Sequence, residues 1–442
     1  MPIDDIRGGR MQNTLPPTVP SGATTNTPSE QRWPEQLGTQ RPNAERFPRR
    51  LFLAWLLPGI LGLALLLAAV LLLEPRANRQ IVYVQNDALR SIRADGTQDR
   101  PFAIDGFADS SFDVPQWARD GKTFATIARP SNELLLVPAA NGKPQRIGLG
   151  VSGPVFIGKS WSYDNQYLTL LTERSGSPRL AVVAVGPGSV ATADLIIDAD
   201  APVSWNPTRN ELLVTAATVA TSPTIQIVTP DGQVRAFVPD DKHAVRHGAT
   251  WSPDGQQIAY VIPAANSRNT SSNRYGGAIW IANSDGGSPR EVIAAGINMS
   301  PTWSEADNTL FFTRLVTETN AYELYRVQID GQGLTKIGRS VPATLINAQN
   351  NPLVVWSPDR TKFFFQGINN EGSTTLYVAP ADGTTSAVLH VSGAAVSIAA
   401  QWSPTSRAVL VADSINQTID LVWTDTDRTD AFARGSFPSW QP

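Results

Sequence analysis

The apolar positions of this chain change their pattern twice before residue 81. Residues 1–48 show no apolar periodicity and are rich in Pro, Thr, Gln, Asn and Ser. Such a segment buries too little apolar surface to offset its ordering entropy, so it is predicted to be a disordered tail. Residues 49–74 contain Leu51–Leu73, a run of 23 residues without a charge. As a helix this run is roughly 34 Å long, which is enough to cross a bilayer.

The apolar run is predicted to be an uncleaved transmembrane signal-anchor helix. It is longer than the apolar core of a cleaved signal peptide, which stays the alternative. Seven arginines precede it, and only Arg76 and Arg79 follow it closely. Because excess positive charge marks the cytoplasmic side, we expect a single-pass protein of the cytoplasmic membrane with its N-terminus in the cytoplasm. Residues 75–80 then form a short linker, which holds the rest of the chain outside, close to the membrane.

From residue 81 to residue 442 the pattern is a repeat of about 45 residues built from short apolar runs. Each unit has a tryptophan, two β-type runs and a turn, most often Asp-Gly. The tryptophans are Trp117, Trp161, Trp205, Trp251, Trp303, Trp356, Trp402 and Trp440. Asp-Gly between two β-runs predicts a hairpin, and four short strands per repeat are typical of a propeller blade. Each tryptophan is expected to pack as a structural residue in the wedge between neighbouring blades.

The two ends of the repeat region complement each other. The region opens at Ile81 with two runs and a turn but no preceding tryptophan strand, and it ends at Trp440 with no further run. Pairing of these ends supplies one complete unit and closes a ring, because a ring leaves only short edges. The predicted fold is therefore all-β: an eight-bladed β-propeller over 81–442, closed by its N- and C-terminal strands. Seven blades are the alternative.

The repeats resemble the WD40-like repeat of TolB-type β-propellers. The matching segments are T-W-S-P-D-G-Q-Q-I-A-Y at 250–260, V-W-S-P-D at 355–359, Q-W-S-P at 401–404, I-W-I-A-N-S-D-G-G at 279–287 and L-Y-V-A-P-A-D-G at 376–383. The resemblance covers about 82% of the chain. It implies a bacterial, extracytoplasmic propeller; the repeat is specific for the fold and not for the function, and it also forms the propeller of prolyl-oligopeptidase-type peptidases. The additional N-terminal domain of TolB has no match in this sequence, so TolB's own role is not expected here.

Composition and motifs argue against most catalytic chemistry. The chain has no cysteine, which excludes thiolate catalysis and cysteine-ligated metals. A net charge of −3 gives no basic field for nucleic acid. No G-x-S-x-G, P-loop or G-x-G-x-x-G motif occurs. His243 and His247 could ligate one metal from a helix, but on the expected strand they lie about 13 Å apart. We therefore predict no enzyme, no metal and no cofactor.

Ligand contacts are expected on the propeller face that carries the long loops, because binding residues concentrate on variable loops of a rigid scaffold. These loops span Pro263–Gly277, Gly338–Asn351, Pro239–Gly248 and Gly106–Val114. The candidate patch contains residues of the types found at binding hot spots, with two histidines near the channel mouth. Its members are Arg268, Asn273, Arg274, Tyr275, His243 and His247. A loop that is long without a ligand is the alternative.

These features predict a membrane-tethered, extracytoplasmic β-propeller that acts as a scaffold for a protein or cell-envelope partner. The membrane bilayer is its first partner, through Leu51–Leu73. A sensor that signals through the tail is one alternative, and an enzyme with its site in the propeller channel is another.

Overall fold

The computed structural model describes residues 79–442 with internal gaps. Residues outside the described set within this range are 103, 105, 108–109, 141–142, 151, 175, 187–190, 198–202, 219–220, 238, 240–246, 264–275, 320, 343–353, 369–370, 372, 392–398, 414–415 and 427. All described residues belong to one compact unit, Leu71–Pro442. The predicted tail, the membrane span and most of the linker lie outside the described residues. In the part of the chain that is described, no helix is long and apolar enough to span a bilayer.

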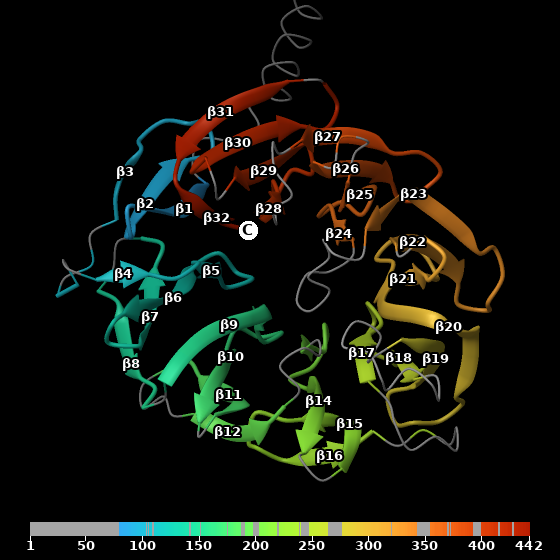
Figure 1. The fold of residues 1–442 in the computed structure, drawn as a ribbon. Coiled ribbons are helices and arrows are strands. Elements are labelled where there is room, and N and C mark those ends of the chain that lie inside the picture. The colour runs from blue at the N-terminus through green and yellow to red at the C-terminus, as the bar shows by residue number, and fades with distance from the viewer. Residues whose placement is uncertain are drawn as a thin grey trace, which may run out of the picture. The chain divides into compact units, whose positions relative to one another are not determined.

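All regular elements of the described residues are β-strands, which confirms the all-β prediction. The strands form antiparallel sheets arranged around a common centre (Figure 1). One sheet joins the two ends of the repeat region, and its spatial order is β3 (Arg100–Pro101), β2 (Ala88–Arg93), β1 (Gln80–Gln85) and β32 (Ser436–Trp440).

The remaining sheets follow one another around the ring in chain order. The first contains β4 (Ser111–Phe112), β5 (Gln116–Trp117), β6 (Thr123–Arg129), β7 (Glu133–Pro138) and β8 (Gln145–Gly148). The second contains β9 (Ser152–Trp161), β10 (Tyr167–Arg174), β11 (Ser177–Ala184) and β12 (Ala191–Ile196). The third contains β13 (Ser204–Trp205), β14 (Leu212–Thr218), β15 (Thr221–Val228) and β16 (Val234–Ala236).

A seven-stranded sheet comes next, followed by two sheets of four strands. The large sheet contains β17 (His247–Trp251), β18 (Gln257–Pro263), β19 (Gly277–Asn283), β20 (Arg290–Trp303), β21 (Thr309–Val316), β22 (Ala321–Gln328) and β23 (Thr335–Pro342). The last two contain β24 (Val355–Trp356), β25 (Lys362–Ile368), β26 (Thr374–Pro380) and β27 (Ala387–Val391), and then β28 (Ala399–Trp402), β29 (Ala408–Asp413), β30 (Thr418–Trp423) and β31 (Thr429–Arg434).

The 14-residue strand β20 explains why one sheet is larger than the others. Its N-terminal part pairs with β19, from Arg290 opposite Ile281 to Asn298 opposite Gly277. Its C-terminal part pairs with β21 and ends with Trp303 opposite Leu310. The same strand is thus the outermost member of one four-stranded unit and the innermost member of the next.

The turn after each tryptophan is stabilised by its own side chains, as the turn from β17 to β18 illustrates. The amide of Gly255 donates to the carbonyl of Ser252 over 2.8 Å, and Gly255 has a φ of +69°. The Ser252 hydroxyl donates to Asp254 over 2.6 Å and accepts the amide of Gln257 over 2.9 Å. Pro253 presets its own φ, so the sequence Ser-Pro-Asp-Gly specifies a tight turn.

All eight repeat tryptophans are buried, with at most 9% of their surface exposed. Each of them lies in a different cluster of buried apolar residues. The cluster that contains Trp161, for example, combines residues of two successive sheets, among them Ile127 and Leu168. The tryptophans therefore hold neighbouring sheets together by burying apolar surface between them.

A ladder of hydrogen bonds joins most of these indoles to the backbone of the preceding unit. In six cases the indole Nε1–H donates to the carbonyl of the residue just before the tryptophan of the preceding unit. The pairs are Trp117 with Ser439, Trp161 with Gln116, Trp205 with Ser160, Trp251 with Ser204, Trp303 with Thr250 and Trp402 with Val355, over 2.8–3.2 Å. Among the described residues, the buried Nε1 atoms of Trp356 and Trp440 have no acceptor.

The two ends of the repeat region meet in the sheet of β1 and β32. Ile81 lies opposite Trp440 and Val82 opposite Ser439 in antiparallel register. Beyond the strands, the amide of Gln441 donates to the carbonyl of Gln80 over 2.8 Å. The Trp117 indole, from the following sheet, donates to Ser439, so the tryptophan ladder crosses this junction as well.

Three of the loops expected from the sequence are partly strand. Strand β23 continues to Pro342 and pairs with β22, so the expectation that a loop begins at Gly338 is wrong. His247 and Gly248 belong to β17, and Ser111–Phe112 forms β4 against β6. Their sequences lack apolar alternation, but a neighbouring strand edge supplies backbone partners, and pairing with it satisfies polar groups that would otherwise need water.

Candidate ligand-binding face

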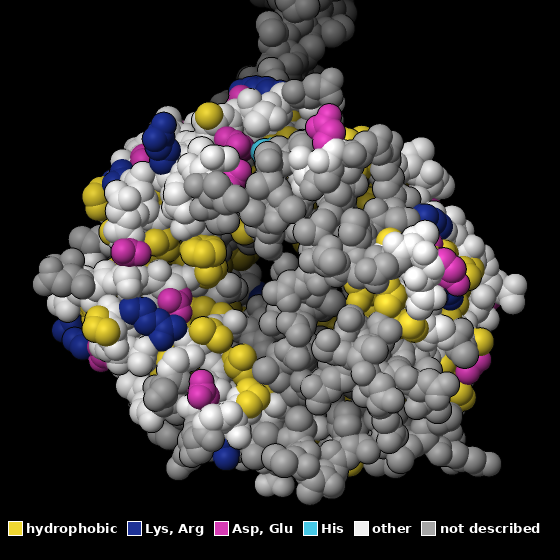
Figure 2. Space-filling view, viewed as in Figure 1, with side chains coloured by type: hydrophobic (Ala, Val, Ile, Leu, Met, Phe, Trp, Pro, Cys, Tyr) yellow, Lys and Arg dark blue, Asp and Glu magenta, His cyan; other side chains and the backbone are white. Residues whose placement is uncertain are grey.

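The patch predicted on the long loops lies outside the described residues and stays a prediction. Its members there are Arg268, Asn273, Arg274, Tyr275 and His243. The backbone of His247 begins β17 and lies opposite Val261. Within the described ranges, no group of three or more His, Asp or Glu side chains is placed to hold a metal ion. The surface of the ring, seen in the direction of Figure 1, is hollowed at its centre (Figure 2).

The structure draws attention to a different set of residues. Each innermost strand ends at its tryptophan, and the residue two positions later stands in the turn that follows, except for Pro442, which follows β32 without a turn. We call these eight positions the turn rim. Five of them are proline, namely Pro207, Pro253, Pro358, Pro404 and Pro442. The three exceptions are Arg119, Tyr163 and Glu305.

Hydrogen bonds between successive turns brace the rim. The amide of Arg119 donates to Asn165 Oδ1 over 2.8 Å, and Asn210 Nδ2 donates to Asp164 Oδ2 over 2.6 Å. Further round, the amide of Asp359 donates to the Ser406 hydroxyl over 2.9 Å. Each bond joins turns of adjacent sheets, so these turns support one another.

The Asp164 carboxylate is an integral part of this bracing. Partial burial pushes its pKa upward, but hydrogen bonds from Asn210, Ser162 and the amide of Gln166 outweigh burial and leave the pKa below its usual value. The carboxylate is therefore ionised at neutral pH and stabilises the turn that carries Tyr163.

Arg119 lies in the turn between β5 and β6. Its side chain is exposed to water, yet the surrounding protein lowers the pKa of its guanidinium by desolvation, an effect that Glu305 opposes. Arg119 follows β5 and Glu305 follows β20, and Figure 1 places these strands on opposite sides of the ring. Glu305 thus favours the charged form of the Arg119 guanidinium, although the two residues follow strands on opposite sides of the ring.

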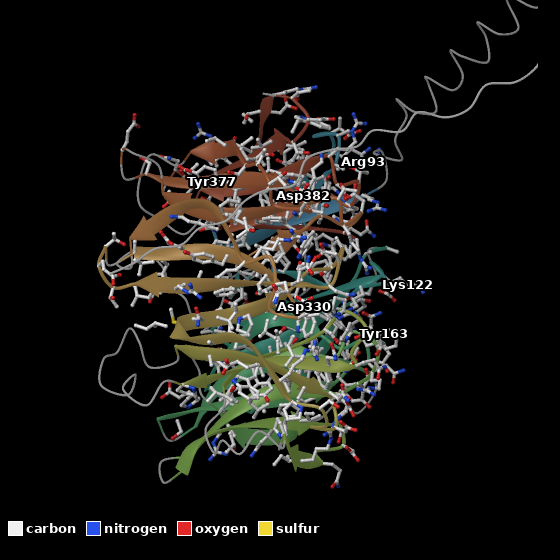
Figure 3. The ribbon with its side chains drawn as sticks, turned by 90° about the vertical axis from the view of Figure 1, so that its right-hand side faces the viewer. Arg93, Lys122, Tyr163, Asp330, Tyr377 and Asp382 are labelled. Carbon is white, nitrogen blue, oxygen red and sulfur yellow. The ribbon has the colours of Figure 1, made fainter. Side chains whose placement is uncertain are left out.

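The other two exceptional residues are also accessible. The side chain of Tyr163 is 49% exposed, which is high for an aromatic residue in a folded sheet protein. Figure 3 shows Tyr163 and Lys122, which belong to the turns of two successive sheets, on the same face of the ring. Glu305 is partly exposed and forms an ion pair with Arg360, whose Nε lies 3.8 Å from Glu305 Oε2.

The turn rim was not predicted from the sequence, because the turns that follow the tryptophans were taken to be uniform. The signal was present in the spacing, since five of eight positions two residues after tryptophan are proline and three are not. Departure from a structural repeat at an exposed position indicates a role other than packing. The electrostatic effect of Glu305 on Arg119 could not be predicted from the sequence, because it depends on the order of the sheets around the ring.

Comparison with known proteins supports the fold and gives no family. No protein-family model matches the chain. A segment of 101 residues is 29% identical to the Tol-Pal system protein TolB of Anaeromyxobacter dehalogenans, and it covers 23% of this chain and 20% of that protein. The chain thus matches about a fifth of the length of this curated relative.

Two solved structures show how far the likeness extends. A prolyl endopeptidase has a TM-score of 0.52 at 10% identity, over 75% of this chain and 50% of that enzyme. TolB from Acinetobacter baumannii has a TM-score of 0.39 at 11% identity, over 82% of this chain and 81% of that one. Together with the ring of sheets, the TolB match and the endopeptidase likeness support a TolB-like β-propeller fold, and neither carries an activity to this chain.

Proposed function

We propose that this protein is a β-propeller scaffold that binds a protein partner and catalyses no reaction. The observation that carries the proposal is the turn rim, where turns braced to one another present Arg119 and Tyr163 to solvent. Arginine and tyrosine dominate the binding energy of many protein interfaces, and a rigid support lowers the entropic cost of contact.

The proposed scaffold is tethered to the cytoplasmic membrane by Leu51–Leu73, with its propeller outside the cytoplasm. The arginine-rich segment before the span supports this orientation. Alkaline phosphatase fused after residue 442 should be active in cells, whereas a green fluorescent protein at the same position should stay dark. Active phosphatase is expected only for an extracytoplasmic C-terminus, so the reverse pattern would place the propeller in the cytoplasm.

We further propose that the ring has eight blades, with β20 shared between two of them. One buried tryptophan per unit, eight in all, supports this number. The alternative of seven blades treats β17–β23 as a single enlarged blade. An averaged electron micrograph viewed down the central axis distinguishes the two rotational patterns.

Photo-crosslinking in native membranes tests the scaffold. A benzoylphenylalanine at position 163 should capture a discrete partner, and the same probe at Val388, which is 59% exposed on the outer strand β27, should not. Capture from position 163 should be lost when Arg119 is changed to Glu. Equal capture from both positions, or capture that ignores the Arg119 change, would contradict the proposal.

The predicted patch on the loop 264–275 is a second proposed contact surface. It rests on Arg268, Asn273, Arg274 and Tyr275, which are of the residue types enriched at hot spots. Replacing residues 264–276 with a short Gly-Ser link should weaken capture of the partner. Capture at the level of the unmodified protein would remove the loop from the interface and leave the rim as the contact surface.

A further inference from the structure

Three positions of the turn rim lack the proline that the other five positions have. Proline at the second position of a tight turn presets φ and reduces the freedom of the unfolded chain, an effect of about 0.4–1 kcal/mol. Arg119, Tyr163 and Glu305 lack the stabilisation that proline gives. The side chains of Arg119 and Tyr163 are exposed to solvent, and that of Glu305 is partly exposed. A side chain that replaces proline without adding buried surface is best explained by what it contacts outside the chain.

Two of the three residues lie in neighbouring turns. The amide of Arg119 donates to Asn165, which lies two residues after Tyr163, so a hydrogen bond joins the two turns. The Tyr163 side chain is also close enough to Arg119 to act on its charge. Across the described residues, neither the Arg119 guanidinium nor the Tyr163 hydroxyl forms a hydrogen bond or an ion pair with a side chain. Arginines in two other turns that follow a tryptophan form ion pairs, since Arg360 pairs with Glu305 and Arg209 with Glu211.

The free donors define the ligand's chemistry. A guanidinium offers five N–H donors in a planar fork and no acceptor, and a phenol adds one O–H donor. Such a set matches a group with two acceptor oxygens in one plane, and pairing would also offset the desolvation of Arg119. Asp120 and Asp164 flank the pair, and Glu305 acts on it from across the opening. A doubly charged phosphate would meet more repulsion there than a singly charged carboxylate.

We infer that Arg119 and Tyr163 form a carboxylate-binding subsite of the turn rim, which reads an acidic side chain or the C-terminal carboxylate of a peptide partner. The inference rests on the proposed scaffold function and specifies the chemistry of its contact. Arg119 binds the two oxygens of the carboxylate through its fork, and the Tyr163 hydroxyl donates to one of them. The hydrogen bond between Arg119 and Asn165 joins the two turns before the partner arrives.

Binding of short synthetic peptides to the full-length protein in detergent tests this subsite. The probes are hexaglutamate with a blocked C-terminus, hexaglutamine with a free C-terminal carboxylate, and hexaglutamine with a blocked C-terminus. Fluorescence polarisation of each labelled peptide should report binding of at least one of the first two and none of the third. The one that binds identifies the source of the carboxylate.

Variants connect the binding to the two residues. Arg119→Ala should raise the dissociation constant about 10- to 100-fold, as expected for loss of a charge-assisted hydrogen bond. Tyr163→Phe should raise it about 3- to 10-fold, since a neutral donor contributes less. Arg93→Ala is the matched control, because Arg93 ends β2 at the outer part of the same ring, and it should leave binding unchanged.

The inference is wrong if no carboxylate peptide binds, or if Arg119→Ala and Arg93→Ala have equal effects. Either result would leave the scaffold function open, because partner capture from position 163 is measured independently of these peptides. Unchanged melting temperatures of the variants exclude misfolding as the cause of a lost signal, and the exposure of Arg119 makes this the expected outcome.

Discussion

The indole hydrogen bonds of the tryptophan ladder should contribute measurably to the free energy of unfolding. Trp161 and Trp356 occupy equivalent positions, are 4% and 9% exposed, and pack in equivalent clusters. They differ in one respect. The Trp161 indole donates to the Gln116 carbonyl over 2.9 Å, whereas the buried Nε1 of Trp356 lacks an acceptor among the described residues. Changing each to Phe therefore separates the hydrogen bond from the packing.

Both changes remove a similar volume from the core, so the packing loss largely cancels in the comparison. Trp161→Phe also removes a hydrogen bond that contributes about 1 kcal/mol, whereas Trp356→Phe removes an unsatisfied buried donor that costs about 1–3 kcal/mol. The expected difference between the two variants is about 2–4 kcal/mol in the free energy of unfolding. Trp161→Phe is the less stable of the two.

Calorimetric melting of the two variants beside the unmodified protein checks this difference. Trp161→Phe should melt several degrees below Trp356→Phe. A third variant, Trp402→Phe, should resemble Trp161→Phe, because its indole donates to Val355 over 2.8 Å. Equal melting temperatures for all three would show that the indole bonds contribute nothing and that packing alone holds the sheets together.

Three further predictions concern single residues and pH. Phe437 has a φ of +52° and is 43% exposed, so Phe437→Asn, which tolerates this backbone region, should raise the melting temperature. Burial and the hydrogen bond to Asp99 raise the pKa of Tyr83 to about 12, above the ordinary value of 10.0. The contribution of Tyr83 to the stability of the folded protein is therefore present below pH 10 and is lost as the pH rises to 12. Tyr83→Phe should thus flatten the melting temperature between pH 10 and 12. The hydrogen bond from Ser252 lowers the pKa of Asp254 below 3.8, so its stabilisation is present above pH 3.8 and is lost in stronger acid. Ser252→Ala should reduce the loss of stability in an acid titration, and an unchanged titration would contradict this role.

The sequence predicted the all-β propeller because its repeat is dense in local signals. Asp-Gly turns, β-runs and a tryptophan at regular spacing each specify a hairpin or a buried position without reference to distant residues. The strand pairing of Ile81 with Trp440 could be anticipated for the same reason, since each end lacked the part that the other contained.

Features that depend on distant residues were not predicted. The extension of β23 to Pro342 depends on backbone groups of β22, and the shared strand β20 depends on two neighbours at once. The turn rim was missed although its residues could be seen in the sequence, because proximity of Arg119 to Tyr163 requires the hydrogen bond to Asn165. The predicted loop patch around Arg274 lies outside the described residues and is still untested.

The central claim is that a partner binds the turn rim of a rigid propeller. Hydrogen–deuterium exchange of the full-length protein, with and without the partner captured from position 163, tests it most directly. If the partner binds the turn rim, amide exchange should slow in the turns that contain Arg119 and Tyr163, with no change in the outer strand β27. Protection confined to β27 and the other outer strands, with unchanged exchange at both turns, would contradict it.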